Sequence, residues 1–412
     1  MQIDIKEFLD DLPHLDSNSG YWLVRANSGD FYTDFNLNSY IGVGWNNISL
    51  KDIQNSNNSS EQLKSLIVNK NPDILNGSES VDEESLELDF VYNKQLDASK
   101  NSLVINQKKL TSRQLSSLAG QLLRFVNEIK INDLVLVPSE NSEQFIVGRV
   151  NSQPFEIDSA AMTEQEKENS NYKHSNFLKR ISVQWVGRFN RENADTALYK
   201  MIYSQHALSN INAYRSYINR AIFDAYILDD DELHLTYHIT QEKNIDAKML
   251  GQFIYQYSEM YESLSQSTDL KIKVNIQSKG PAESTAKKMI GGSIAFAILF
   301  CCGSASYAGG KISYDDTGKI NIEMNGVAAQ NRQNQTTDTA NKSKKIAAQL
   351  QLENKKADSI MEREEKAYAL AKKLQVPISA LGIELPHRAE VALQKQLDRE
   401  NKKKAHSENS EP

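Results

Sequence analysis

Two short pairs of acidic and basic residues have the spacing that magnesium-dependent nucleases use. Such a site needs an Asp at the end of one strand and an acidic residue two positions before a Lys on the next, so that Mg²⁺ is held and a water molecule is positioned. Asp246 and Lys248 have this spacing, as do Asp269 and Lys271. The first pair begins a predicted helix, and the second lacks a clear upstream Asp for the metal. The sequence leaves enzymatic activity open and favours its absence, with a divergent nuclease as an alternative.

Two histidines could contribute to a metal site. His234 and His238 lie four residues apart in a predicted strand, so their side chains share one face. Asp231 precedes them in an acidic turn. A third ligand at a useful spacing is missing from the sequence, which favours ordinary sheet residues over a metal site. We therefore expect no metal ion and no cofactor.

The elements that could position a binding surface are concentrated in the first half of the chain. Between Tyr21 and Trp45 the sequence predicts a strand, a Gly/Asp turn, an aromatic helix start and a second strand that ends in Gly-x-Gly-Trp. A helical turn is predicted at Ala119–Phe125. Three predicted strands follow, at residues 129–137, 145–150 and 180–185.

These motifs together resemble the N-terminal domain of Mrr-like prokaryotic restriction proteins, which is a β-barrel of the PUA/EVE type. The similarity extends over roughly residues 20–220. It departs from the family at Asn132, where Gly usually precedes Asp, and in a longer segment between Leu50 and Ser112. The resemblance implies a domain that binds DNA or RNA and that could read a modified base.

In such a barrel, a base would lie in a cleft where aromatic rings stack on it and amide and guanidinium groups bind its edges. The residues that the resemblance places around this cleft are Trp22, Arg25, Trp45, Gln121 and Arg124, with Tyr32 or Phe35 nearby. The alternative for the aromatic residues is a place in the core, where rings at strand ends often lie. Arginine is costly to bury without a partner, which favours Arg25 and Arg124 as binding residues.

Further basic residues could contact a phosphate backbone or could form an ordinary solvated face. They are Lys179, Arg180, Arg188 and Arg191.

The predicted fold class is α+β, in several segments. These are an N-terminal helix at 1–20, the recognition domain at 21–226 with an Asn/Ser-rich insertion at 51–112, a small α+β domain at 229–326, a linker at 327–345 and a charged helical tail at 346–412. Within them, we expect helices near Ser60–Val68 and over 212–226, and a chain break at Gly280-Pro281. A charged helix at 346–374 is expected to be interrupted by Val376-Pro377.

An uncharged segment at 289–310 has two interpretations. Its length meets the roughly 20 apolar residues that a membrane-spanning helix needs, and lysines flank it on both sides. Many Gly and Ser residues dilute its apolar character, which favours a buried Gly/Ala-rich helix packed on a sheet. The two cysteines, Cys301 and Cys302, are adjacent within it, and this arrangement fits a reducing compartment.

The sequence therefore favours a cytoplasmic prokaryotic defence or restriction-type protein that recognises nucleic acid through its first half and transmits or executes the response through the rest. A net charge of −7 argues against a basic coat over the whole surface, although not against a local basic groove. The alternatives are a membrane-acting effector of the inner membrane that inserts residues 289–310, and the divergent nuclease. The charged C-terminal helices could also mediate self-association.

Overall fold

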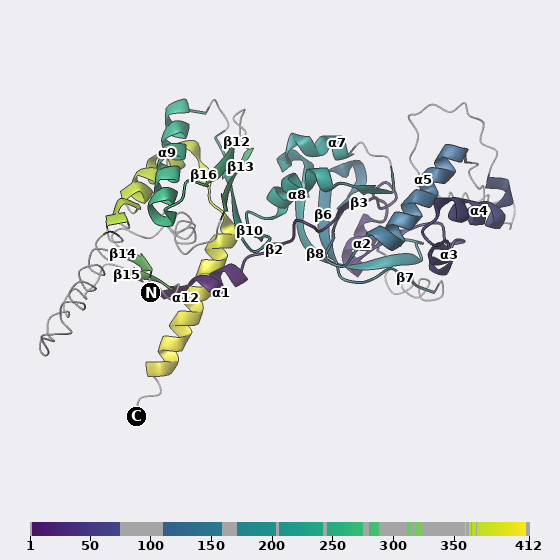
Figure 1. The fold of residues 1–412 in the computed structure, drawn as a ribbon, viewed down its shortest axis with the longest axis horizontal. Coiled ribbons are helices and arrows are strands. Elements are labelled where there is room, and N and C mark those ends of the chain that lie inside the picture. Colours follow the sequence, from purple (N-terminus) through teal and green to yellow (C-terminus); the bar gives the residue numbers. More distant parts are fainter. Residues whose placement is uncertain are drawn as a thin grey trace, which may run out of the picture. The chain divides into compact units, whose positions relative to one another are not determined.

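The computed structural model describes residues 2–74, 110–158, 171–202, 206–241, 245–274, 280–287, 311–314, 319–323, 359, 362–363, 365–367 and 369–408. The fold is of the mixed α+β class that the sequence predicts (Figure 1). It divides into two compact units. Unit 1 comprises Met1–Ser17 and Phe223–Pro412, and unit 2 comprises Asn18–Ile222.

Unit 2 is built on one curled seven-stranded sheet that forms a half-barrel (Figure 1). Its strand order is β4-β8-β6-β5-β3-β9, and the short β7 pairs with β8. The strands are β3 (Tyr21–Val24), β4 (Tyr40–Val43), β5 (Leu134–Pro138), β6 (Gln144–Val150), β7 (Phe155–Glu156), β8 (Lys179–Asn190) and β9 (Leu208–Asn210). Among the described strands, β4, β7 and β9 each pair with a single neighbour and so lie at the edges of this sheet.

The central strands of this sheet are continuous apolar runs. Leu134–Val137 and Phe145–Val147 are buried at every position, as expected for strands that are covered on both faces. A β-bulge between Val147 and Gly148 interrupts the pairing of β6 with β8, and such a bulge increases the local bend of a sheet. The strand predicted at 129–137 begins only at Leu134, because the preceding residues form a turn in which Asn132 has φ 75°.

Helices cover this sheet and line its ends. They are α2 (Tyr32–Asn38), α3 (Leu50–Asn55), α4 (Ser60–Lys70), α5 (Ser112–Leu123), α7 (Tyr199–Ile202) and α8 (Arg215–Ile222). The helix predicted near Ser60–Val68 is thus confirmed by α4. A capping box begins α5, because the Thr111 hydroxyl accepts from the Gln114 backbone and the Gln114 side chain accepts from the Thr111 backbone. A π-helical turn, Arg124–Glu128, continues it.

Unit 1 contains a six-stranded sheet with the order β12-β13-β11-β10-β2, and β16 pairs with β11. The strands are β2 (His14–Leu15), β10 (Ala225–Leu228), β11 (Glu232–Ile239), β12 (Lys271–Val274), β13 (Gly280–Lys287) and β16 (Ile383–Glu384). A second sheet has the order β1-β15-β14, from β1 (Gln2–Asp4), β14 (Lys311–Tyr314) and β15 (Lys319–Glu323). The last two strands pair antiparallel.

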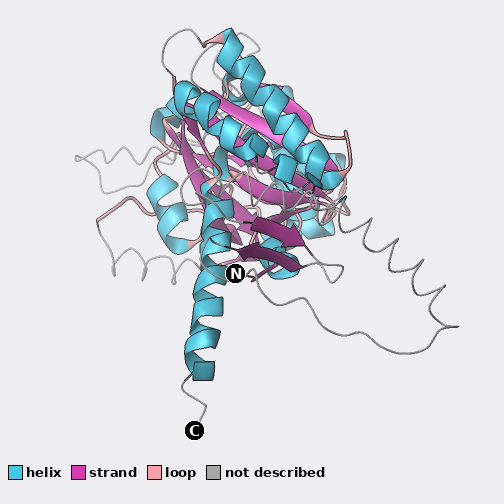
Figure 2. Ribbon diagram, turned by 90° about the vertical axis from the view of Figure 1, so that its left-hand side faces the viewer, coloured by secondary structure: helices cyan, strands magenta, loops and turns pink. Residues whose placement is uncertain are grey.

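The core of unit 1 joins segments from both ends of the chain. It contains Phe8 and Leu12 from α1 (Ile5–Asp10) and the turn after it, Phe253 and Tyr257 from α9 (Ala247–Ser265), and Leu393 from α12 (His387–Glu408). Figures 1 and 2 both show the N-terminus beside α12. The N-terminal segment is therefore part of unit 1 and does not precede unit 2 as a separate element.

Three sequence-based expectations, one at the boundary between the units and two within unit 1, are wrong. The helix expected over 212–226 ends at Ile222, because Ala225–Leu228 forms β10. Gly280-Pro281 does not break the chain but begins β13, where Pro281 pairs with His238 one residue beyond the last pair with β12. A proline at the end of the ladder removes no hydrogen bond from the middle of the sheet.

The third correction concerns the C-terminal helices. The helix at residues 369–381 runs through Val376-Pro377 without a break. Its buried positions recur at helical spacing and belong to the unit 1 core, namely Leu370, Ala371, Leu374, Ile378 and Leu381. Burial of such a stripe offsets the cost of roughly 3 kcal/mol that a proline imposes inside a helix. Within the predicted tail, residues 369–381 and the first turns of α12 thus contribute to the core of unit 1.

Several expectations lie outside the described residues. They concern the apolar segment 289–310 with Cys301 and Cys302, the linker 327–345 and the loops of the insertion from residue 75 to 109.

Candidate functional site

A small pocket lies in unit 2 where the ends of β3 and β4 meet α5. Its walls come from five separate stretches of the chain. The lining residues are Arg25, Gly42, Val43, Gly44, Trp45, Leu118, Gln121, Leu122, Phe177 and Ala207. The pocket has a volume of about 40 Å³, which is room for roughly three waters.

The Gly-x-Gly motif brings a ring against the backbone of β4. A Cβ atom on Gly42 would lie 3.1 Å from Cβ of Phe177, and one on Gly44 would lie 3.1 Å from the ring of the same residue. Side chains at these positions would push Phe177 away from the strand. The two glycines therefore form the flat floor on which one aromatic wall of the pocket rests.

Trp45 forms the second aromatic wall from an unusual backbone conformation. Its φ is 61°, in the left-handed region that bulky residues rarely adopt. The side chain is half-buried and lines the pocket. Such a conformation persists only where neighbouring contacts hold it, and it is found most often at functional sites.

Consecutive buried cations of β8 hold the backbones of both aromatic residues. Lys179 is fully buried, and its Nζ donates to the carbonyls of Trp45 at 2.7 Å and Ile48 at 2.9 Å. Burial lowers the pKa of Lys179 to about 8, against the opposing charges of Glu156 and Asp52. Arg180 is also buried, and its Nε donates to the carbonyl of Phe177 at 2.9 Å.

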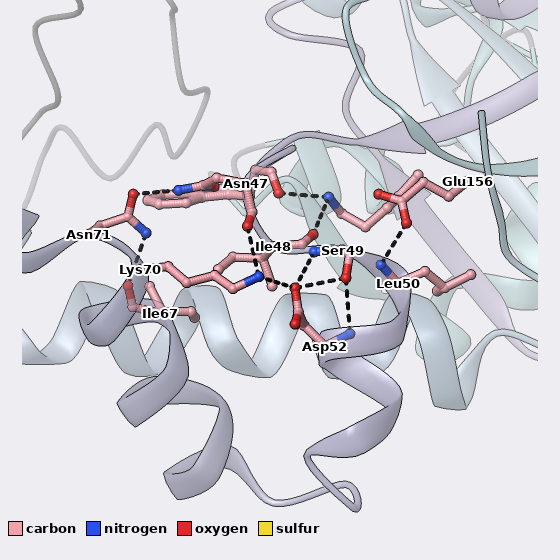
Figure 3. A network of polar contacts seen from close by, with 11 residues as sticks. Asn47, Ile48, Ser49, Leu50, Asp52, Ile67, Lys70, Asn71 and Glu156 are labelled. Carbon is pink, nitrogen blue, oxygen red and sulfur yellow. Dashed lines mark hydrogen bonds and ion pairs between the residues drawn. The ribbon is translucent and has the colours of Figure 1, made fainter. Parts of the chain in front are cut away.

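The loop after Trp45 is fastened by a wider polar network (Figure 3). Asp52 accepts from the Ser49 backbone at 2.8 Å and from Lys70 Nζ at 2.5 Å. Although burial opposes it, hydrogen bonds from Lys70 and Ser49 lower the pKa of Asp52 below its usual value. Asn47 bonds to Asn71, so the loop is tied to the end of α4. The position of Trp45 is thus fixed from both sides of the loop.

Two further sequence-predicted residues line the same pocket. The Gln121 side chain is buried, accepts from the Leu208 backbone at 3.1 Å and donates to Ser117 at 3.2 Å. Arg25 is half-buried and donates to the Ile202 carbonyl at 2.5 Å. The structure therefore brings Arg25, Trp45 and Gln121 together, although they are far apart in sequence.

The other predicted residues lie elsewhere. Trp22 is buried in the core, and its indole N–H donates to Asp133 at 2.8 Å. Phe35 is also buried, and its ring centroid lies 6.4 Å from that of Phe177. Tyr32 donates to Gln144 at 3.0 Å, and burial raises its pKa. Arg124 is half-buried at the end of α5 and does not line the pocket.

The basic residues assigned to phosphate contact or to a solvated face separate into two groups. Lys179 and Arg180 fit neither interpretation, because both side chains are buried where β8 pairs with β4 on one side and β7 on the other. Arg180 lies 3.9 Å from the Tyr40 ring centroid, and burial lowers its pKa. Arg188 is exposed and Arg191 is half-buried, with its guanidinium 5.2 Å from the Tyr199 ring centroid.

The acidic and histidine candidates of unit 1 have structural contacts. Asp246 is the N-cap of α9 and accepts from the Lys248 and Met249 backbones, so helix capping accounts for its spacing from Lys248. Asp269 accepts from the Tyr261 hydroxyl at 2.7 Å.

His234 stacks on Tyr226, and its Nδ1 lies 2.9 Å from Glu283. Among the described residues, no group of three or more His, Cys, Asp or Glu could hold a metal ion. Burial lowers the pKa of His238, against the charges of Glu384 and Asp224.

Across the described segments, no helix combines the length and the apolar character that crossing a bilayer requires. Comparison of the chain with known protein families, with curated proteins and with solved structures finds no match.

Proposed function

We propose that unit 2 is a PUA/EVE-type recognition module that binds a nucleobase of DNA or RNA at the pocket, in a prokaryotic defence or restriction-type protein. The observation that carries the proposal is the convergence of Arg25, Trp45 and Gln121 on one pocket. An indole, a guanidinium and an amide are the groups that stack on bases and bind their edges. Unit 1 then transmits or executes the response.

The size of the pocket constrains how a base binds. A volume of about 40 Å³ is far below the roughly 300 Å³ at which ligand pockets begin. A whole base ring therefore stacks against the partly exposed indole of Trp45 at the mouth, and only its edge or a small substituent enters. In this arrangement Trp45 supplies affinity by stacking, while Arg25 and Gln121 distinguish one base from another.

The construction of the walls supports a binding role over simple packing. Lys179 and Arg180 each hold the carbonyl of a pocket aromatic residue. Two buried cations are costly to desolvate, and here they fix the two residues that shape the pocket. Trp45 is held in a left-handed conformation by the same contacts, which suits a preorganised site.

The proposal is tested by measuring the binding of full-length protein to fluorescent oligonucleotides, both plain and carrying modified bases. Base stacking on an aromatic side chain contributes about 1–3 kcal/mol, so Trp45→Ala should weaken binding by about tenfold or more. Phe155→Ala is the matched control, because Phe155 is an exposed aromatic residue of unit 2 outside the pocket. Equal affinity of the wild type and Trp45→Ala would sink the proposal.

A further inference from the structure

The helix that forms one wall of the pocket carries an unbalanced positive charge. From Leu110 to Asn127 the sequence contains Arg113 and Arg124 but no acidic residue. Arg124 Nη2 lies 4.0 Å from the position that a Cβ atom on Gly120 would occupy, so the guanidinium lies back along the helix. Within the described part of the chain, this guanidinium has no hydrogen bond or ion pair.

A histidine and a hydroxyl lie beside this arginine. His206 Nδ1 is 3.5 Å from Oγ of Ser117, which stands two turns before Arg124 on the same face of the helix. Burial and the charge of Arg124 both lower the pKa of His206. The guanidinium and the imidazole are thus near enough to repel each other when both are protonated.

This group adjoins the pocket through shared residues. Gln121 lines the pocket and donates to Ser117 at 3.2 Å, while Ala207 lines it directly after His206. An anion placed between Arg124, His206 and Ser117 would receive charge-assisted hydrogen bonds and would relieve the repulsion between the two basic groups. A phosphate group has the charge and the acceptor oxygens for all three donors.

We propose that Ser117, Arg124 and His206 form a phosphate subsite beside the pocket, which binds the phosphodiester group next to the recognised base. The inference rests on the proposed function for the identity of the ligand, but not for the affinity for phosphate itself. It assigns Arg124 to the nucleic-acid backbone and not to the base edge. Contacts of this kind hold a nucleic acid in register without reading its sequence.

The first test uses full-length protein and inorganic phosphate. The NMR signals of His206, identified among the seven histidines by His206→Gln, are followed during a phosphate titration. The expected result is a saturable shift and a rise in the pKa of His206, both lost in Arg124→Gln and retained in Arg113→Gln. Arg113→Gln is the matched control because it removes the same charge from the other end of the same helix. The absence of a saturable shift in the wild type overturns the subsite.

The second test separates this inference from the proposed function. In oligonucleotide binding, Arg124→Gln should weaken affinity by about tenfold for every sequence. It should also reduce the slope of the logarithm of the binding constant against the logarithm of the salt concentration by about one. An unchanged salt dependence in a variant that retains its fold overturns the subsite, even if Trp45→Ala abolishes binding. A phosphate-dependent shift of His206 without any oligonucleotide binding supports the phosphate subsite and counts against nucleobase recognition.

Discussion

Both units bury a charged side chain of a strand, but they satisfy it in different ways. In unit 2, Lys179 of β8 donates to two main-chain carbonyls of the loop that carries Trp45. In unit 1, Glu283 of β13 accepts from the Tyr226 hydroxyl at 3.0 Å and lies 2.9 Å from His234 Nδ1. The first charge holds the backbone of a loop, whereas the second holds side chains of its own sheet.

This difference indicates which buried charge belongs to a site. Tyr226, His234 and Glu283 lie on the adjacent strands β10, β11 and β13, so their contacts fix the packing of the sheet. The partners of Lys179 instead belong to a loop whose tryptophan lines a pocket. We infer that a loss of Glu283 affects stability alone, while a loss of Lys179 affects both stability and binding.

The largest expected effect is that of Glu283→Ala. Glu283 is 1% exposed, and its removal takes away the carboxylate that accepts from the buried Tyr226 hydroxyl and that lies nearest to His234. Breaking a buried polar network of this kind costs about 3–5 kcal/mol. The free energy of unfolding, measured by urea denaturation with circular dichroism, should fall by that amount.

The control for this variant is Glu384→Gln, which changes an exposed carboxylate on β16 of the same sheet. It should alter the free energy of unfolding by less than about 0.5 kcal/mol. A Glu283→Ala protein that keeps its stability but loses oligonucleotide binding would reverse the assignment of roles to the two units.

The next largest effect is expected for Lys179→Met. The substitution removes the Lys179 donor from the Ile48 carbonyl, at a cost of about 1–3 kcal/mol. It also removes one of two donors from the Trp45 carbonyl, which keeps its bond from the Ile48 backbone N–H. Oligonucleotide affinity should fall together with the free energy of unfolding, because Trp45 loses the contact that holds its backbone. Lys173→Met, which removes an exposed lysine of the same unit, should leave both quantities nearly unchanged.

The pH dependence of the free energy of unfolding gives a second test of the role of Lys179. The pKa of Lys179 falls from 10.5 to about 8 on folding, so between these values the unfolded chain holds a proton that the folded chain has released. Stability contributed by this residue therefore rises with pH from about 8 to 10.5 and is lost as pH falls through 8. The stability gap between wild type and Lys179→Met should widen across this window in urea titrations. A gap that narrows with rising pH would contradict the assignment.

A smaller effect is expected from Gly42→Ala in the pocket floor. The added Cβ would lie 3.1 Å from Phe177 Cβ and 3.2 Å from the Lys179 carbonyl, so an aromatic wall or the strand must move. Overpacking of this kind costs about 1–3 kcal/mol. The control is Gly251→Ala, because no atom lies within 4 Å of a Cβ at that position in α9. Weakened oligonucleotide binding with Gly42→Ala alone would link the floor to the site.

The sequence predicts those elements whose pattern is local. The strands β5, β6 and β11 and the amphipathic helix α9 are predicted from the spacing of apolar residues within a short stretch of sequence. The pairing of β2 with β10 joins His14 to Ile227, and nothing in either short segment indicates the other. Both predictions that used proline as a break in structure are wrong. Pro281 lies where the pairing of β13 with β12 ends, and Pro377 lies in a helix that its buried face stabilises.

The candidate site was predictable to a similar extent. Arg25, Trp45 and Gln121 follow from the resemblance, but Trp22 could not be placed by alternation because all four residues of β3 are buried. Phe177 has no sequence signal of its own, and its position depends on glycines in a distant strand. Lys179 and Arg180 suggest an exposed basic stripe until the neighbouring strands are known. Burial by distant segments is thus the information that the local pattern lacks.

The smallest effect is expected for Asp246 of unit 1, one of the acidic residues with the spacing of a nuclease site. Asp246 accepts from the Lys248 backbone at 2.8 Å and from the Met249 backbone at 3.1 Å. If its role is to cap α9, Asp246→Ala should lower the free energy of unfolding by about 1 kcal/mol. Asp246→Asn should retain most of that stability, because an amide oxygen also caps a helix.

A plasmid-nicking assay with Mg²⁺ tests the alternative role of Asp246 as a metal ligand. In that role both variants would lose activity, since an amide is a poor substitute for a carboxylate on a hard cation. Equal nicking by wild type and Asp246→Asn, or none by either, would leave Asp246 as a structural residue and keep the proposed binding chemistry in unit 2.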